Sequence, residues 1–166
     1  MTEQPLVIFD TQRGGPSTGL PTKQEQSDLM AMVYGTHGEI PKVIIAPSTM
    51  EEAFYDTIQA FNIAEELQVP VIVLTDLQLA LGKQSVDPFD YSKVEIRRGK
   101  LVTPEDEAST EYYKRYENTE DGISPRVLPG MKGGIHHVTG VEHDEQGKPS
   151  EAKGNRKAQM DKRFRK

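Results

Sequence analysis

A glycine-rich loop near the amino terminus carries residue types suited to binding an anion. Residues 13–19 read Arg-Gly-Gly-Pro-Ser-Thr-Gly. The loop contains three glycines, Gly14, Gly15 and Gly19. Glycines let backbone N–H groups approach an anion closely, and the Arg13 guanidinium can hold a carboxylate or phosphate by paired hydrogen bonds. Ser17 and Thr18 add hydroxyl groups. The loop predicts an anion site, and a tight turn with a surface arginine is the alternative with about equal weight.

Neither common nucleotide-binding motif accounts for this loop. Gly14 and Gly19 have the separation of a P-loop, but Leu20-Pro21 stands where that motif requires Lys-Ser or Lys-Thr. The Gly-x-Gly-x-x-Gly pattern of dinucleotide-binding domains does not occur in the chain. The type of ligand that the loop binds therefore depends on the position of the loop in the fold.

That setting is predicted to be the edge of a parallel sheet. Apolar runs at 6–9, 42–46 and 69–74 predict three strands buried on both faces. Helical spacing lies between them, so strands and helices alternate, as in parallel sheets with right-handed crossovers. Ligands of such sheets bind beyond the carboxyl ends of the strands. We therefore expect the glycine loop and the loops at 46–48 and 75–76 to share one edge.

Two capping boxes mark the predicted starts of the helices. Thr22 is followed three residues later by Glu25, and Ser48 by Glu51. Gly35 suits the position after the first helix. The second helix has its apolar face at Phe54, Ile58, Phe61 and Ala64. A short helix or turn is predicted at 76–81.

Composition divides the chain into two parts. The 166 residues include 20 Lys+Arg, 26 Asp+Glu and no Cys. Residues 1–90 carry most of the apolar periodicity and an acidic excess, whereas 91–166 are rich in Gly, Pro and charge. We expect an α/β core at 1–90, with an incomplete doubly wound parallel sheet, and an irregular extended arm at 91–166 that ends in a basic helix.

The same composition excludes several classes of protein. Without Cys the chain can form neither disulfides nor Cys-ligated metal or iron–sulfur sites. No apolar run has the length of a membrane span or signal peptide, so we expect a soluble, cytoplasmic protein without a membrane partner. The acidic balance argues against nucleic acid as the main partner.

The loop and its flanks resemble the alpha subunit of 2-oxoacid:ferredoxin oxidoreductases, most closely the 2-oxoglutarate type. The string Gln-Arg-Gly-Gly-Pro-Ser-Thr-Gly at 12–19 carries the resemblance, within a matching stretch over 2–22. Further matching segments lie at 25–29, 35–39, 46–49, 70–76 and 139–144. The resemblance thus covers nearly the whole chain.

This resemblance implies an enzyme that decarboxylates a 2-oxoacid, forms an acyl-coenzyme A and passes electrons to ferredoxin. It implies thiamine diphosphate as cofactor, with the alpha subunit facing its aminopyrimidine half. The beta subunit would hold the diphosphate, its magnesium ion and the iron–sulfur cluster. Arg13 takes the position of the arginine implicated in binding the 2-oxoacid carboxylate. Ser17 and Thr18 would line the same pocket.

The chain also departs from the family pattern. It lacks the Tyr-Pro-Ile-Thr-Pro substrate loop, which lies upstream in the family, and the upstream glutamate that activates the cofactor. We interpret the chain as a segment of the pyrimidine-binding domain that is inactive alone. Two alternatives stay open: a non-catalytic assembly module of the same fold, and an unrelated anion-binding α/β domain.

The remaining polar residues give weaker signals. His136 and His137 are adjacent, so in a strand they point to opposite faces and chelate poorly. A role other than metal binding is therefore favoured for them and for the nearby His143, and what that role is stays open. The basic stretch at 153–166 is interpreted as a surface helix rather than a nucleic-acid site, because it lacks interleaved aromatic residues.

Overall fold

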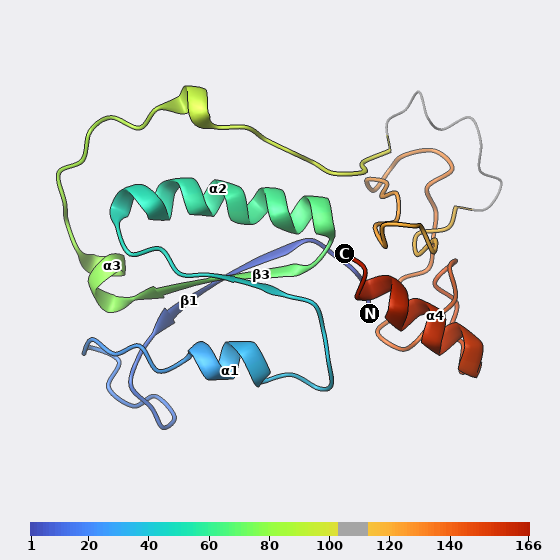
Figure 1. Cartoon of the computed structure of the whole chain (residues 1–166), viewed down its shortest axis with the longest axis horizontal. Coiled ribbons are helices and arrows are strands. Elements are labelled where there is room, and N and C mark those ends of the chain that lie inside the picture. The colour runs from blue at the N-terminus through green and yellow to red at the C-terminus, as the bar shows by residue number, and fades with distance from the viewer. Residues whose placement is uncertain (103–112) are drawn as a thin grey trace. The chain divides into compact units, whose positions relative to one another are not determined.

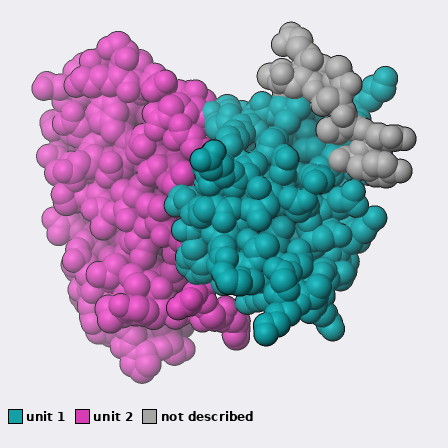
Figure 2. Space-filling model, turned by 45° about the vertical axis from the view of Figure 1, so that its right-hand side comes forward, with its two compact units in different colours: residues 1–4, 98–166 teal, residues 5–97 magenta. Residues whose placement is uncertain are grey.

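The computed structural model of the chain describes residues 1–102 and 113–166. These residues form two compact units, one of residues 5–97 and one of residues 1–4 with 98–166 (Figure 2). The units are described separately below. Whether they correspond to domains divided at residue 90 stays a prediction.

The unit of residues 5–97 is built on a three-stranded parallel sheet. Its strands are β1 (Leu6–Gln12), β2 (Val43–Ile45) and β3 (Pro70–Asp76), in the order β1-β3-β2. Both pairs are parallel, with Leu6 opposite Pro70 and Val43 opposite Val71. The predicted α/β class with a parallel sheet is confirmed, and all three strands end at the same edge.

Helices flank this sheet on both sides. The long helix α2 (Met50–Leu67) lies along one face, and Figure 1 draws α1 (Leu29–Tyr34) on the opposite side. The short helix α3 (Leu77–Leu81) follows β3 directly, and a 3₁₀ turn lies at Tyr91–Lys93. No helix among the described residues combines the length and apolarity that crossing a membrane requires.

The core lies between α2 and the central strand. Ala60 and Ala64 of α2 pack against Val71 and Val73 of β3, and all four side chains are at most 2 % exposed. Small residues on the helix let it approach the strand closely, so the branched valines fill the space between them. Residues 71–74 of β3 are buried, as a central strand requires.

Burial differs from the prediction at two elements. β1 was expected to be buried on both faces, yet Leu6 and Phe9 are about half exposed, because β1 is an edge strand of the described sheet. Phe61 was assigned to the apolar face of α2, but its side chain is 53 % exposed. Ala64, assigned to the same face, is buried as predicted, and Ala60 joins it in the buried stripe, since these small side chains permit close contact.

The predicted starts of both helices are wrong by different amounts. The first helix begins at Leu29 rather than Thr22, because side chains of the intervening residues bind elsewhere: Ser27 Oγ, for example, donates to the Arg13 carbonyl at 2.7 Å. The second capping box is one residue later than predicted. Thr49 Oγ1 accepts from the Glu52 backbone N–H at 3.1 Å, and the Glu52 carboxylate accepts from the Thr49 N–H.

The second unit is mostly irregular and ends in helix α4 (Lys153–Arg163). The basic residues of α4 were expected at the surface, but Lys162 and Arg163 are buried. Lys162 Nζ lies 3.0 Å from a Glu3 carboxylate oxygen, and Arg163 Nη2 lies 2.6 Å from one of Glu142. Buried charges of this kind need partners, and these two glutamates provide them.

Candidate functional site

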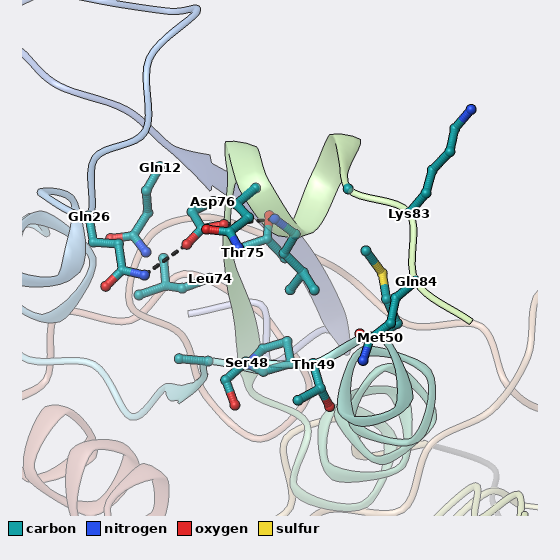
Figure 3. Close-up of a pocket in the computed structure, with 15 residues that line it drawn as sticks. Gln12, Gln26, Ser48, Thr49, Met50, Leu74, Thr75, Asp76, Lys83 and Gln84 are labelled. Carbon is teal, nitrogen blue, oxygen red and sulfur yellow. Dashed lines mark hydrogen bonds between the residues drawn. The ribbon is translucent and has the colours of Figure 1, made fainter. Parts of the chain in front are cut away.

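A cavity of about 640 Å³ opens at the carboxyl ends of the three strands (Figure 3). Residues at the ends of all three strands line the cavity. Gln12 is the last residue of β1, residues 46–49 follow β2, and Thr75 and Asp76 are the last two residues of β3. Further lining comes from Gln26, and after β3 from residues 78–79 and 82–84. The sheet edge predicted to bind a ligand therefore carries a cavity.

Asp76 is the acidic centre of this cavity. Its carboxylate accepts from the Leu79 backbone N–H at 2.9 Å, which caps α3, and from Gln26 Nε2 at 2.8 Å. Figure 3 shows Gln26 reaching toward Asp76, with the Lys83 side chain directed away from both. The two hydrogen bonds, the backbone one foremost, hold the pKa of Asp76 below its usual value. The carboxylate therefore stays ionised and acts as a hydrogen-bond acceptor at neutral pH.

The end of β1 is fastened to the segment that precedes α1. Gln12 is 7 % exposed and its Oε1 accepts from the Asp28 backbone N–H at 3.3 Å. The Arg13 backbone N–H donates to Asp28 Oδ2 at 3.2 Å, and Ser27 Oγ donates to the Arg13 carbonyl. The backbone of Arg13 is thus held on both sides. Its position relative to the strand end is therefore fixed.

The glycine loop closes on itself beyond this point. The Leu20 backbone N–H donates to the Gly14 carbonyl at 2.9 Å, which ties the two ends of the loop together. Gly19 has φ +55°, and a Cβ there would lie 1.6 Å from the Gly14 carbonyl oxygen. Only glycine fits this position. The loop is therefore closed, and the glycine at position 19 permits the closure.

Arg13, Ser17 and Thr18 are exposed in this loop and do not line the cavity. No hydrogen bond or ion pair within the described residues engages the Arg13 guanidinium, so it is available to an external anion. Its charge also reaches Asp10 in β1. Burial and the neighbouring Asp28 raise the pKa of Asp10, whereas the Arg13 charge acts in the opposite direction.

Residues that the motifs did not single out make most of the cavity. Gln12, Gln26 and Asp76 contribute amide and carboxylate groups, yet single glutamines have no diagnostic spacing. The available signal was positional, because Gln12 and Asp76 follow two of the predicted strands within three residues, and the loop at 75–76 was expected at this edge. Gln26 was beyond that reasoning, since the segment containing it was assigned to a helix.

The histidines play separate roles in the second unit. His136 Nδ1 donates to the Gly134 carbonyl at 2.7 Å, and His137 is exposed. His143 is fully buried against the Tyr116 ring, with centroids 3.9 Å apart. Within residues 1–102 and 113–166 no three His, Asp or Glu side chains converge in a way that would hold a metal ion.

Comparison with known proteins assigns the family. Residues 1–162 match the family model described as "Pyruvate flavodoxin/ferredoxin oxidoreductase, thiamine diP-bdg". The chain belongs to this family. The resemblance that the glycine loop carries is therefore confirmed, including the relation to thiamine diphosphate-binding domains.

Individual members of the oxidoreductase family align along most of the chain. The alpha subunit of 2-oxoacid:ferredoxin oxidoreductase 2 from Aeropyrum pernix is 46% identical over 168 residues, covering 99% of this chain and 25% of the relative. The 2-oxoglutarate synthase subunit KorA of Methanothermobacter thermautotrophicus is 40% identical over 150 residues, covering 90% of this chain and 38% of the relative. The chain thus matches part of an alpha subunit.

A solved structure gives the same result at the level of the fold. The 2-oxoglutarate:ferredoxin oxidoreductase from Magnetococcus marinus, with 2-oxoglutarate, coenzyme A and succinyl-CoA bound, superposes with a TM-score of 0.90. It is 40% identical in sequence, and the match covers 99% of this chain and 28% of the solved chain. The family fold is therefore present over the full matched length.

Proposed function

We propose that this chain forms part of the alpha subunit of a 2-oxoacid:ferredoxin oxidoreductase of the 2-oxoglutarate type. The proposed enzyme decarboxylates the 2-oxoacid oxidatively, forms an acyl-coenzyme A and transfers two electrons to ferredoxin. The observation that carries the proposal is the glycine loop at the end of β1, whose arginine has a fixed backbone and an available guanidinium.

Arg13 is proposed to bind the carboxylate of the 2-oxoacid. A guanidinium presents two parallel N–H donors that match the two carboxylate oxygens. Because Ser27 and Asp28 hold the Arg13 backbone, less freedom is lost when the substrate binds. The Ser17 and Thr18 hydroxyls would contact the same substrate from the loop.

The cavity at the sheet edge fits the aminopyrimidine half of thiamine diphosphate. Its polar groups are mainly amides, hydroxyls and the Asp76 carboxylate, and Lys83 is the one lysine or arginine among the described residues that line it. Such a lining suits an uncharged ring with hydrogen-bonding edges, and it suits the anionic diphosphate poorly. Gln12, Thr75 and Asp76 would face the ring, and the beta subunit would hold the diphosphate with magnesium.

The bound cofactor supplies the carbanion chemistry that decarboxylation requires. In this proposal the chain binds and orients the 2-oxoacid and forms one wall of the cofactor site. This chain contains no cysteine to ligate an iron–sulfur cluster, and the cluster would lie in the beta subunit, as the family resemblance implies. We therefore expect the isolated chain to be inactive.

Reconstitution tests this proposal. The chain is combined with the rest of an alpha subunit and with a beta subunit, and reduction of ferredoxin is followed. We expect reduction that depends on 2-oxoglutarate, coenzyme A and thiamine diphosphate together, and no reduction with the chain alone. A complex that assembles but binds no thiamine diphosphate would instead support a non-catalytic assembly module.

A further inference from the structure

The segment that follows the glycine loop is anchored to the end of β3. Residues 21–27 are exposed and lie outside the helices and strands. Two glutamines of this segment nevertheless hydrogen-bond to residues 50 and 54 positions further along the chain. The proposed function gives these two contacts no role.

Gln26 binds the acidic centre of the cavity at the sheet edge. Its Nε2 donates to Asp76 Oδ2 at 2.8 Å, and Figure 3 draws this contact as a dashed line. The acceptor is an ionised carboxylate, and hydrogen bonds to such a group are stronger than those between neutral partners. The contact therefore holds Gln26 more firmly than a neutral hydrogen bond at the surface would.

Gln24 binds the first turn of α3. Its Oε1 accepts from the Gln78 backbone N–H at 2.8 Å. Backbone N–H groups in the first turn have no partner within their own helix, and Asp76 already accepts from the N–H of Leu79. Gln24 therefore supplies a second capping contact to α3, from a distant segment of the chain.

Glu25, between the two glutamines, contacts the glycine loop. A Cβ at Gly14 would lie 2.1 Å from Glu25 Oε2, so the carboxylate lies directly against the Gly14 backbone. Successive side chains of an extended segment point to opposite sides, which explains the arrangement. One side of residues 24–26 binds the end of β3 and the start of α3, and the other side contacts the residue after Arg13.

The two residues that follow this segment hold the backbone of Arg13. Ser27 Oγ donates to the Arg13 carbonyl at 2.7 Å, and Asp28 Oδ2 accepts from the Arg13 N–H at 3.2 Å. Residues 24–28 thus contact both the cavity wall at 76–78 and the arginine of the loop. A displacement of this segment from β3 would move the backbone of Arg13 with it.

We propose that Gln24 and Gln26 are positioning residues that hold Arg13 in place relative to the cavity at the sheet edge. The inference rests on the proposed function, in which Arg13 binds the 2-oxoacid and this cavity holds the aminopyrimidine half of thiamine diphosphate. Reaction requires the 2-oxoacid and the cofactor to meet within a narrow range of distance and angle, and a displacement of about 1 Å can lower a rate about 100-fold. The two glutamines would act on that geometry through Arg13 and not by binding the 2-oxoacid.

Amide hydrogen exchange of the full chain tests the anchoring without enzymatic activity. Gln26→Glu keeps the size of the side chain but replaces the donor that faces Asp76 with a second carboxylate. We expect exchange about tenfold faster at the Gln78 N–H, whose acceptor Gln24 is unchanged, and at the Arg13 N–H.

Lys23→Ala is the matched control for this experiment. It alters an exposed side chain of the same segment, next to Gln24, and should leave both exchange rates unchanged. An unchanged rate at the Arg13 N–H in Gln26→Glu, or equal acceleration by Lys23→Ala, would overturn the inference.

The kinetics of the reconstituted enzyme distinguish positioning from a merely structural role. Gln24→Ala suits this test, because Gln24 lies outside the described lining of the cavity. We expect kcat/KM for 2-oxoglutarate to fall about fivefold or more while Arg13 is present. In the Arg13→Ala background the same substitution should change kcat/KM little further, because no guanidinium is left to position.

The outcomes separate this inference from the proposed function. A kcat/KM that Gln24→Ala leaves unchanged, or lowers equally with and without Arg13, would overturn the inference and leave the proposed function in place. An assembled complex with the unsubstituted chain that does not turn over 2-oxoglutarate would contradict the proposed function, and the inference would fail with it.

Discussion

Replacing Gly19 by alanine is expected to open the loop that carries Arg13. The added Cβ would lie 1.6 Å from the Gly14 carbonyl oxygen, which is backbone and has little room to move. That carbonyl accepts the Leu20 N–H that closes the loop at 2.9 Å. The clash and the hydrogen bond therefore cannot coexist.

The expected magnitude follows from two contributions. A residue other than glycine in the left-handed region costs about 1–2 kcal/mol, and Gly19 has φ +55°. Loss of the Leu20–Gly14 hydrogen bond costs about 1 kcal/mol more. Together the two contributions destabilise the closed loop by at least about 2 kcal/mol, which corresponds to about 30-fold or more in its opening equilibrium.

Amide hydrogen exchange at Leu20 measures this opening directly. Exchange is expected to be at least about 30-fold faster in Gly19→Ala than in the unsubstituted chain. Gly38→Ala is the matched control, because Gly38 has φ +74° and no atom within 4 Å of the added Cβ. Unchanged exchange at Leu20 in Gly19→Ala, or equal acceleration by Gly38→Ala, would refute the reasoning.

Two further predictions concern carboxylates. Burial alone would raise the pKa of Glu142, but hydrogen bonds from Arg163 and Arg156 lower it to about 2. The folded-state pKa of Glu142 lies below its ordinary value of 4.5, so the ionised carboxylate and its two arginines stabilise the fold above pH 4.5. This stabilisation is lost as the pH falls toward 2. Allowing for solvent screening, we expect the free energy of unfolding measured with urea to fall by about 1–2 kcal/mol between neutral and acid pH. Glu142→Gln should show little of this pH dependence. Asp76→Ala removes the acceptor of the Leu79 N–H, so that amide is expected to exchange about tenfold faster, and an unchanged rate would contradict the cap.

The strands were predictable because their signal is local and strong. The runs at 42–46 and 69–74 are apolar at nearly every position, and the observed β2 and β3 lie within two residues of them. The sequence does not state that β1 lies at an edge of the described sheet, because strand order depends on contacts between distant segments. The exposure of Leu6 and Phe9 was therefore mispredicted.

Local helix signals failed where side chains found tertiary partners. Thr22 and Glu25 have the spacing of a capping box, but the segment before α1 is held by hydrogen bonds to Gln12 of β1 and to Asp76. Likewise Lys162 belongs to the basic stretch that was predicted to form a surface helix, and its partner Glu3 lies 159 positions away in the chain. Pairings at that separation leave no pattern in a single sequence.

The candidate site was predicted at its sheet edge, and the roles of its loop residues stay a prediction. The glycine loop had a recognisable ordered motif, and the loops after β2 and β3 were placed on the same edge by topology. The amide groups of Gln12 and Gln26 were not anticipated, because glutamine at one position carries no spacing signal. The fold brings these two glutamines together in the lining of one cavity, where their amides can contact a ligand.

The kinetics of Arg13 variants in the reconstituted enzyme test the central claim most directly. For Arg13→Ala we predict that kcat/KM for 2-oxoglutarate falls about 100-fold, since a pair of charge-assisted hydrogen bonds to the carboxylate is lost. Arg13→Lys should recover part of this loss, because lysine keeps the charge without the paired donors. Lys23→Ala, an exposed cation nearby in the sequence, should have little effect. An Arg13→Ala enzyme with unchanged kcat/KM would contradict the account.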